Sequence, residues 1–481
     1  MSFLTLEEMR VAVGGTWRVA PATGSRQPES VSIDTRTVID GACYIAIRGE
    51  RHDGHDHLRA ALDGGAAALL IEAGRMPEDF ETDVPVLEVG DTVHALEGLA
   101  RAWRARLSAT VVAITGSAGK TTVRRLVEAI CTSAGPTTAS IRSFNNDIGL
   151  PLTILSARPD DDYLILEVGT NAPGEIRQLT DIARPSIALV TTIGRAHLEG
   201  LGSLEGIARE KAAIYETLPA HGVAVVPFDA PHAGTILERA VPEGVAVVRF
   251  GRTGGDLRLL ERRSRGLTGS QELVLEDGCT LRILLPGAHN ALNACAALAV
   301  GRALGIDDER IAQALCTVEP DGMRLAPILL EDRGTMILSD VYNANPDAVL
   351  AALETFAECA AEAPRRVVIL GDMLELGPDE AELHAEMGRA VGRLNERHPV
   401  TVAVFVGERS AAGADALEAM GFGNLLVHLP RLDDRLCEAV ADVIDDGDAV
   451  LVKASRGMAL ERIIDAVRRS GEAPVGELAA N

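Results

Sequence analysis

Nearly unbroken apolar runs alternate with amphipathic stretches along most of the chain. In its middle part, the runs TVVAIT, YLILEV, SIALVTTI and GVAVVPF are typical of parallel strands that are buried on both faces. Helical patterns lie between them at 120–133, 174–182 and 204–218. This alternation predicts an α/β fold built on parallel sheets.

The pattern divides the chain into three predicted domains. Residues 1–95 combine short apolar runs with Gly and Asp turns, which predicts a small N-terminal α/β domain, followed by a connecting helix around 95–107. Residues 96–320 form the central parallel-sheet domain, and the alternation of polar and apolar positions at 257–285 predicts a small antiparallel patch within it. Residues 321–481 return to strand–helix alternation, which predicts a Rossmann-like doubly wound domain.

Composition narrows the class of protein. The net charge of −24 argues against nucleic-acid binding, which needs a basic face. No apolar run is long enough to span a bilayer, and the start MSFLTLEEMR lacks the features of a signal peptide, so we expect a cytoplasmic protein. The seven scattered cysteines, with no CxxC pair, predict reduced thiols rather than a disulfide framework or a zinc site.

The stretch ITGSAGKTTVRRLVEAI, residues 114–130, has the form of a P-loop-type phosphate site. A strand leads into a Gly-rich turn and then into a helix whose N-terminus favours anions. Only two residues separate Gly116 from the Gly119-Lys120 pair, where the usual P-loop has four. Lys120 can reach a terminal phosphate, and the Thr121 hydroxyl can bind Mg²⁺. A plain turn before an exposed Lys120 is the alternative, which the flanking strand, threonines and helix disfavour.

Three further residues are candidates for a cation site next to this loop. Glu167 ends the strand YLILEV, where a metal ligand belongs, although a carboxylate there can equally cap the next turn. His197 follows another strand. Its imidazole can bind a metal, although Mg²⁺ prefers oxygen, and the alternative is an exposed loop histidine. Lys211 lies on an inward helical face, either as a snorkelling or salt-bridged lysine or as one whose lowered pKa allows modification.

Polar clusters mark the remaining candidate positions. One cluster comprises Arg142 and the segment SFNND, with Asn145 and Asn146, and it can bind substrate or form an Asx turn. A second is HNALN, whose His289 and Asn293 can read an adenine edge or cap a helix. Asp340 ends the strand TMILSD, where a carboxylate can bond a ribose. After the last strand, three residues can grip a carboxylate or phosphate unless they form a surface turn: Lys453, Ser455 and Arg456.

Taken together, these motifs resemble the Mur ligase family. The matching segments include DTRTVIDGACYIAIRGERHDGHDHL, TGSAGKTT, SFNNDIGLPLT, LEVGTNAPGEI, IGRAHLEGLGS, AREKAAIYE, GAHNALNACAA, DVYNANPD, LGDMLELG and VKASRGMALE, in family order from about residue 32 to 462. The chain departs from the family pattern at Ala118, where Asn is frequent, at PFDAP from Pro227, at Ala454, where Gly is usual, and in DTR instead of DSR. None of these changes removes a charged group from the candidate site.

The resemblance implies a role for each candidate residue. Residues 1–95 would bind the UDP end of the substrate, and residues 96–320 would bind ATP. Lys120 would contact the ATP γ-phosphate, and Lys211 would be carbamylated, which turns an ammonium into an oxygen ligand. The catalytic set would be Lys120, His197 and Lys211. The Mg²⁺ ligands would be Thr121, Glu167, His197 and Lys211. The ATP contacts would be Thr115, Gly116, Ser117, Ala118, Gly119, Lys120, Thr121, Thr122, Asn290, Asn293, Arg324 and Asp340. The substrate contacts would be Ser32, Asp34, Thr35, Arg36, Asn145, Asn146, Asn343, Asn345, Ser455 and Arg456.

The resemblance also implies a reaction. The segments NNDIGLPLT, YNANPD and GDMLELG are typical of family members that join D-alanyl-D-alanine to UDP-N-acetylmuramoyl-tripeptide through an acyl phosphate, with ATP and Mg²⁺, in peptidoglycan synthesis. We expect a monomer whose outer domains close around the substrates. The alternatives are a family member that adds a single amino acid, a folylpolyglutamate synthase, and a regulator that binds ATP without catalysis.

Overall fold

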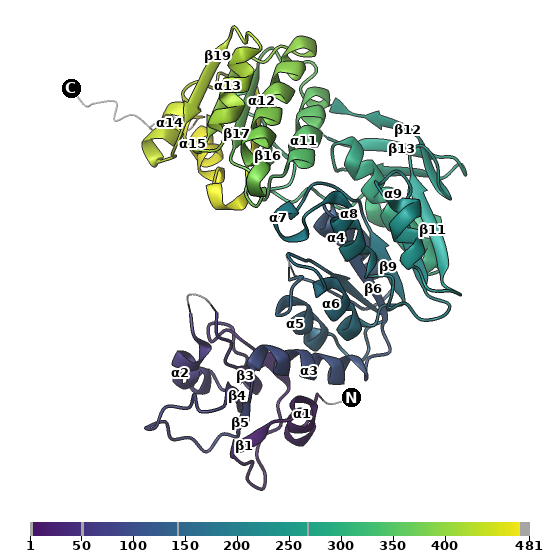
Figure 1. Cartoon of the computed structure of the whole chain (residues 1–481), viewed down its shortest axis with the longest axis vertical. Coiled ribbons are helices and arrows are strands. Elements are labelled where there is room, and N and C mark those ends of the chain that lie inside the picture. The colour runs from purple at the N-terminus through teal and green to yellow at the C-terminus, as the bar shows by residue number, and fades with distance from the viewer. Residues whose placement is uncertain (1–2, 50–51, 142–143, 267–268, 472–481) are drawn as a thin grey trace, which may run out of the picture.

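The computed structural model describes residues 3–49, 52–141, 144–266 and 269–471. The described residues form three β-sheets of five, nine and six strands, each from a separate stretch of the chain. The three parts follow one another from the N-terminal to the C-terminal end of an elongated, curved molecule (Figure 1). The predicted α/β class with three successive sheets is therefore confirmed.

The N-terminal part carries a mixed sheet in the strand order β1-β5-β4-β3-β2. Only β1 runs antiparallel to its neighbour, and β2 lies at the edge that faces the central part. Its elements are α1 (Leu6–Val13), β1 (Thr16–Val19), β2 (Ser30–Ser32), β3 (Ala42–Ile45), α2 (Leu58–Asp63), β4 (Ala68–Glu72), β5 (Val86–Val89) and α3 (Thr92–Arg104).

The connecting helix α3 packs on the central part instead of standing free. The indole Nε1 of Trp103 donates a 2.9 Å hydrogen bond to the carbonyl of Ala157, and Arg104 donates one of 2.8 Å to the carbonyl of Ala183. α3 runs across residue 95, so the exact boundary between the first two domains stays a prediction, as does the one at residue 320.

The central sheet has the strand order β14-β13-β12-β11-β10-β9-β6-β8-β7. Strands β6 to β11 are parallel, and β12 to β14 continue the sheet as the predicted antiparallel patch. Its elements are β6 (Thr110–Thr115), α4 (Lys120–Ala134), β7 (Thr137–Ala139), α5 (Gly149–Ser156), β8 (Tyr163–Glu167), α6 (Glu175–Ala183), β9 (Ile187–Val190), α7 (Leu198–Leu201), α8 (Leu204–Ala212), β10 (Val223–Pro227), β11 (Ala246–Gly251), β12 (Leu257–Ser264), β13 (Gln271–Leu275), β14 (Thr280–Ile283), α9 (Ala288–Ala303) and α10 (Asp308–Leu315).

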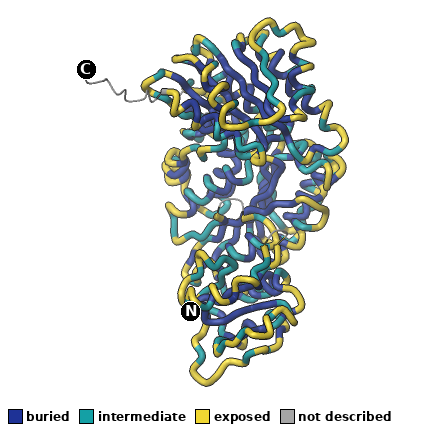
Figure 2. The backbone as a smooth tube through the Cα atoms, turned by 90° about the vertical axis from the view of Figure 1, so that its left-hand side faces the viewer, coloured by how far each residue is buried: buried dark blue, intermediate teal, exposed yellow. Residues whose placement is uncertain are grey.

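Both faces of the central parallel strands are covered by helices. In β6, Val111 and Ala113 pack in one apolar cluster with α5, α6 and α8, whereas Val112 and Ile114 pack in another with α4, α9 and α10. Successive side chains of a strand point to opposite faces, so every position of a strand covered on both sides has to be apolar. This explains the unbroken runs in the sequence and the buried strands in Figure 2.

One helical pattern ends earlier than predicted. The pattern at 204–218 forms a regular helix only as far as Ala212, because the chain then tightens into turns in which Ala213 and Ile214 donate to carbonyls three residues back. Ile214 and Tyr215 are still fully buried against the sheet, which accounts for the apolar pattern.

The C-terminal sheet has the strand order β15-β16-β20-β17-β18-β19 and is parallel except for β15 at its edge. The sequence pattern missed β15. α11, α12 and α13 cover one face, and α14 and α15 cover the other, as in a doubly wound fold. Its elements are β15 (Ala326–Leu330), β16 (Thr335–Asp340), α11 (Pro346–Cys359), β17 (Arg366–Gly371), α12 (Glu380–Arg397), β18 (Val402–Val406), α13 (Ala411–Ala419), β19 (Leu425–Leu429), α14 (Asp434–Ala441), β20 (Ala449–Lys453) and α15 (Glu461–Gly471).

Two predictions from composition can be compared with this fold. All seven cysteines are free thiols, as expected. Among the described residues, no helix is both long and apolar enough to cross a membrane.

Candidate active site

The loop between β6 and α4 has the backbone of a phosphate-binding loop. Gly116 and Gly119 have φ values of +149° and +81°. A Cβ at Gly116 would lie 1.8 Å from the Thr191 hydroxyl, and one at Gly119 would lie 2.6 Å from the Asn293 side-chain oxygen. Both positions therefore require glycine, for conformation and for space. The tight packing fixes the loop and leaves the first N–H groups of α4 available for an anion.

Ser117 anchors the loop to the segment that follows β9. Its backbone N–H donates to the carbonyl of Thr192 at 3.0 Å, and its hydroxyl donates to the carbonyl of Gly194 at 3.0 Å and accepts from that residue's N–H at 2.9 Å. Ala118 at the tip is exposed. The tip is thus the part of the loop that an incoming group meets first.

Lys120 begins α4 and folds back over the loop. Its Nζ donates a 2.8 Å hydrogen bond to the carbonyl of Gly116. Burial lowers the pKa of Lys120, Glu167 opposes this shift, and Arg324 adds to it. Thr121 is buried in the first turn of the helix, and Thr122 is half-buried beside it.

Glu167 and Lys211 each bury a polar atom that has no partner among the described residues. Glu167 at the end of β8 accepts from Asn145 through Oε1 at 2.8 Å, while its Oε2 is buried and unpaired. Lys211 in α8 is fully buried, and its Nζ is unpaired as well. The Thr115 hydroxyl is a third such atom. Buried polar groups are rarely left unpaired, because desolvation without a new bond is unfavourable.

Burial holds the pKa of Lys211 well below its usual value. The charge of Lys120 lowers it further, and Glu210 opposes the shift. Glu210 accepts from the backbone N–H groups of Gly174 and Ile176, at 2.7 and 2.8 Å, so its carboxylate is already engaged in fixing the loop after β8. Burial thus favours the neutral amine of Lys211 more than in an ordinary lysine, and its Nζ has no acidic partner among the described residues, so the salt-bridged alternative considered from the sequence does not fit.

His197 precedes α7 with a positive φ of +57° and lines a cavity of about 230 Å³ together with Lys120, Asn145 and Asn146. Burial lowers the pKa of His197, and so do Lys120 and Lys211. Glu375 of the C-terminal part opposes that shift, and its Oε2 lies 3.3 Å from His197 Nδ1.

These donors fit a divalent cation only as a mixed set. No cluster of three or more His, Cys, Asp and Glu side chains that could hold a metal occurs in the described parts of the chain. A cation here would depend on hydroxyl oxygens, on Glu167, and on oxygens from a bound nucleotide or a modified Lys211, which suits Mg²⁺ with its retained waters and phosphate ligands.

The two asparagines after β7 differ in their roles. The Asn145 side chain is bonded to Glu167, at the candidate cation position. The Asn146 oxygen accepts the N–H of Gly149, the first residue of α5, at 2.9 Å, so this side chain makes a local turn contact, as the alternative to substrate binding supposed. Arg142 and Ser143 of the same predicted patch lie outside the described residues.

The residues expected at the nucleotide come from two parts of the chain. Asn290 and Asn293 on α9 are buried and hydrogen-bonded to each other at 3.0 Å, and Asn293 packs against the phosphate loop. Arg324 lies over the Tyr342 ring, 3.8 Å from its centre, and its Nε is buried without a partner among the described residues. His289 is close by, and burial lowers its pKa to about 4.

Asp340 forms a buried ion pair that the sequence pattern did not predict. Its Oδ2 lies 2.5 Å from Nζ of Lys453, which also donates to the carbonyl of Asn343 at 3.0 Å. Lys453 is 1% exposed. The pair joins the ends of the neighbouring strands β16 and β20 and fixes the start of the segment DVYNAN.

Replacing Lys453 with Met should destabilise the protein by about 3 kcal/mol, because it leaves a buried carboxylate unpaired. The measurement is urea unfolding followed by far-UV circular dichroism. Separate transitions of the three parts have to be fitted separately. The double variant Lys453→Met/Asp340→Leu removes both charges and should recover most of the loss. A single variant as stable as the unmodified chain would contradict the pairing.

The other C-terminal candidates make local contacts. Asn345 caps α11 through its side chain, and the Asn343 oxygen accepts the next backbone N–H. The Ser455 hydroxyl accepts the N–H of Leu374 at 3.0 Å, and exposed Arg456 pairs with Glu461. Their substrate roles stay predictions.

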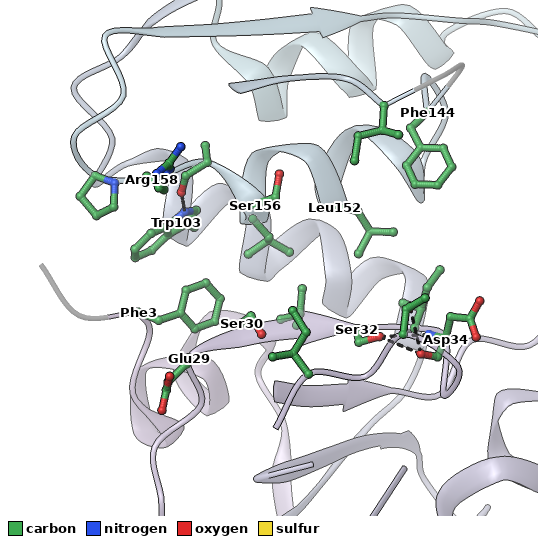
Figure 3. A pocket seen from close by; sticks show the side chains of 18 residues that line it. Phe3, Glu29, Ser30, Ser32, Asp34, Trp103, Phe144, Leu152, Ser156 and Arg158 are labelled. Carbon is green, nitrogen blue, oxygen red and sulfur yellow. Dashed lines mark hydrogen bonds between the residues drawn. The ribbon is translucent and has the colours of Figure 1, made fainter. Parts of the chain in front are cut away.

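A larger cavity of about 730 Å³ lies between β2 and α5, at the junction of the N-terminal and central parts (Figure 3). Ser32 and Asp34 line one wall, and Phe144 and Leu152 line the other. Hydrogen bonds from the Arg36 side chain and backbone lower the pKa of Asp34 to about 2. Thr35, between these two residues, is half-buried.

Glu375 was not assigned a role from the sequence, and the ion pair of Lys453 differs from the role that its position at the end of the last strand suggested. Glu375 lies in the motif GDMLELG, but only the fold brings it to His197. Lys453 carried a compositional signal: lysine occurs at three positions only, Lys120, Lys211 and Lys453, although the chain has 46 basic residues. Lys120 and Lys211 lie close enough for the charge of Lys120 to lower the pKa of Lys211. Lys453 belongs to the C-terminal part, where it pairs with Asp340.

Fold and site together define a phosphate-binding α/β protein whose candidate residues come from three successive sheets. Comparison with family models gives the class: the Mur ligase family catalytic domain matches residues 28–104, the Mur ligase middle domain 114–301, and the Mur ligase glutamate ligase domain 323–456. The chain belongs to the Mur ligase family, as its motifs indicated.

Its relatives cover almost the whole chain. It is 32% identical to UDP-N-acetylmuramoyl-tripeptide–D-alanyl-D-alanine ligase from Escherichia coli K12, over 98% of this chain and 100% of that one. It is 34% identical to the ligase of the same name from Bacillus subtilis 168, over 90% and 92%.

Solved structures agree. MurF from Acinetobacter baumannii superposes with a TM-score of 0.83 at 28% identity, covering 97% of this chain and 98% of that one. MurF ligase from Thermotoga maritima in complex with ADP superposes with a TM-score of 0.77 at 27% identity, covering 92% of this chain and 98% of that one.

Proposed function

We propose that the protein is an ATP-dependent ligase that joins D-alanyl-D-alanine to UDP-N-acetylmuramoyl-tripeptide, a step of peptidoglycan precursor synthesis. The observation that carries the proposal is a phosphate loop whose Lys120 lies near two side chains with buried unpaired atoms, Glu167 Oε2 and Lys211 Nζ. A protein that only binds ATP has no use for this second set of polar atoms. The relatives of nearly equal length that carry this activity in their names support the choice of substrates.

The reaction would proceed in two displacements. A carboxylate oxygen of the tripeptide attacks the γ-phosphorus of ATP, the bond to the β-phosphate oxygen breaks, and ADP leaves. The amine of the dipeptide then attacks the acyl carbon, loses a proton, and phosphate departs. Lys120 and the N–H groups at the start of α4 would bind the phosphates as negative charge develops on them, which is where positioning and electrostatics contribute most.

A divalent cation and a carbamate would complete the site. Mg²⁺, when bound, supplies positive charge to the transferring phosphoryl group. Thr121, Glu167 and His197 would hold it, and carbamylated Lys211 would add an oxygen ligand. The unpaired Glu167 Oε2 and the unpaired amine of Lys211, whose pKa is lowered by burial, support this assignment.

The nucleotide and the substrate would lie on opposite sides of the cation. ATP would extend toward Asn290, Asn293, Arg324 and Asp340. The peptide end of the substrate would meet Asn145 and the C-terminal residues Asn343, Asn345, Ser455 and Arg456. Its UDP end would reach Ser32, Asp34, Thr35 and Arg36, and the cavity beside two of them is large enough for a ligand group. The reaction would take place in the cytoplasm, with the chain acting as a monomer.

Phosphate release tests the proposal directly. With ATP and Mg²⁺, we expect release that requires both UDP-N-acetylmuramoyl-tripeptide and D-alanyl-D-alanine. Single amino acids, and folate with glutamate, serve as control acceptors. Release with a single amino acid instead of the dipeptide would assign another family activity, and ATP binding without any release would favour a regulator.

A further inference from the structure

The loop at 371–377 of the C-terminal part is fixed from three sides. The Asp372 carboxylate accepts the backbone N–H at the start of α13, at 2.8 Å. The Nε2 atom of His384, which is fully buried, accepts the N–H of Met373 at 3.0 Å, while its Nδ1 faces the carbonyl of Glu380 at 2.7 Å. Together with the Ser455 hydroxyl, these contacts leave the loop little freedom of its own.

This fixed loop presents Glu375 to the central part. Glu375 has a φ of +62°, a left-handed conformation that is uncommon for a residue other than glycine, Asn or Asp. Such a conformation persists only where the surroundings impose it, and it occurs most often at functional positions. The loop also lies close to α7, since a Cβ at Gly377 would be 3.8 Å from Glu199.

The Glu375 carboxylate faces His197 across the boundary between the two parts. Its Oε2 lies 3.3 Å from Nδ1 of the imidazole. His197 also lines the cavity shared with Lys120 and Asn145. When Nδ1–H donates to this carboxylate, Nε2 is the nitrogen left to bind a cation. A metal-bound histidine nearly always donates its other N–H in this way, which fixes its tautomer and raises its basicity.

We infer that Glu375 is a positioning residue for His197, so that docking of the C-terminal part completes the cation site of the central part. This inference rests on the cation site of the proposed function. Because coupling between two binding events is reciprocal, the bound cation should in turn favour the docked arrangement by the same factor.

Another ion pair between the same two parts provides a matched control. Arg262 of β12 donates to Glu358 of α11 at 2.8 Å, and neither residue lies at the phosphate loop or at His197. Loss of this pair weakens docking without touching the candidate cation ligand. A change at Glu375 that exceeds the change at Glu358 therefore measures the contact with His197, not docking alone.

The test is Mn²⁺ binding to the full chain in the presence of β,γ-methylene-ATP, followed by electron paramagnetic resonance. Electron spin-echo modulation reports a coupled imidazole nitrogen, and His197→Ala assigns it. We expect Glu375→Ala to weaken Mn²⁺ binding by about 10–100-fold, the usual effect of removing such a partner. Glu375→Gln keeps an acceptor oxygen and should lose less. Glu358→Gln should stay within about twofold of the unmodified chain, as expected for a partly exposed ion pair away from the candidate cation ligands.

The possible results separate the positioning role of Glu375 from the proposed cation site on which it rests. Nitrogen coupling in the unmodified chain together with unchanged Mn²⁺ affinity in Glu375→Ala would overturn the positioning role but leave the cation site standing. An equal loss in Glu375→Ala and Glu358→Gln would also overturn it, in favour of docking alone. If the unmodified chain shows no nitrogen coupling, His197 is not a ligand, and both fail. Thermal unfolding of each variant excludes a folding defect.

Discussion

Replacing Lys120 with Ala should lower the rate of ADP formation by about 1,000-fold or more, because the transferring phosphoryl group loses its positioned cation. In the structure this ammonium lies over the phosphate loop, bonded to the Gly116 carbonyl at 2.8 Å, where a terminal phosphate would replace the carbonyl as its partner. Single-turnover ADP formation measures the effect without interference from product release.

The same variant should fold normally. Lys120 makes one hydrogen bond to the protein, and burial already disfavours its charge, as the lowered pKa indicates. Arg125→Ala, on the same helix, is the matched control and should keep nearly full activity. Lys120→Arg should not restore the rate, since a planar guanidinium does not fit a position shaped for a compact ammonium. A near-normal rate in Lys120→Ala would refute the assignment.

Much of the fold follows from local sequence. Strands buried on both faces must be apolar throughout, so β6, β8, β9 and β10 stand out as unbroken runs. The phosphate loop is equally local: two glycines, a lysine and a helix start lie within five residues, 116–120, and Gly116 and Gly119 adopt the conformations that this chemistry requires. The pattern missed β15, because a short edge strand that is only partly buried lacks such a run.

The candidate site could be predicted only in part, because long-range pairing decides what each polar side chain does. Asp340 and Lys453 are 113 residues apart and meet because β16 and β20 are neighbours. Glu375 reaches His197 only through the arrangement of two sheets. The sequence left two roles open for the neighbouring residues Asn145 and Asn146. In the structure Asn146 contacts the first N–H of a helix, whereas Asn145 contacts Glu167. Nothing in the spacing of the segment SFNND distinguishes the asparagine that lies at the site from the one that makes a local turn contact.

Lys211 is the residue for which sequence and structure together make the sharpest prediction. Replacing it with Met should lower activity by about 1,000-fold, the several kcal/mol expected when a cation site loses a charged ligand. Stability should be unchanged or higher, because an unpaired amine is replaced by an apolar chain of similar length in a fully buried position. A lysine with a purely structural role would give the opposite pair of results: intact activity and lower stability.

The carbamate itself can be observed, because the chain contains only three lysines. Burial lowers the pKa of Lys211, so the amine is neutral at pH values where an ordinary lysine is protonated. It can therefore attack CO₂ at a lower pH than an ordinary lysine can, forming an N–C bond and releasing one proton, and the product should be lost as the pH falls through that lowered pKa. With ¹³C-bicarbonate, we expect one carbamate resonance that is absent from Lys211→Met and retained in Lys120→Ala. A resonance that survives in Lys211→Met would assign the carbamate to another amine. Absence of any carbamate resonance in the unmodified chain would mean that Lys211 is a plain buried amine, which cannot supply the missing oxygen ligand.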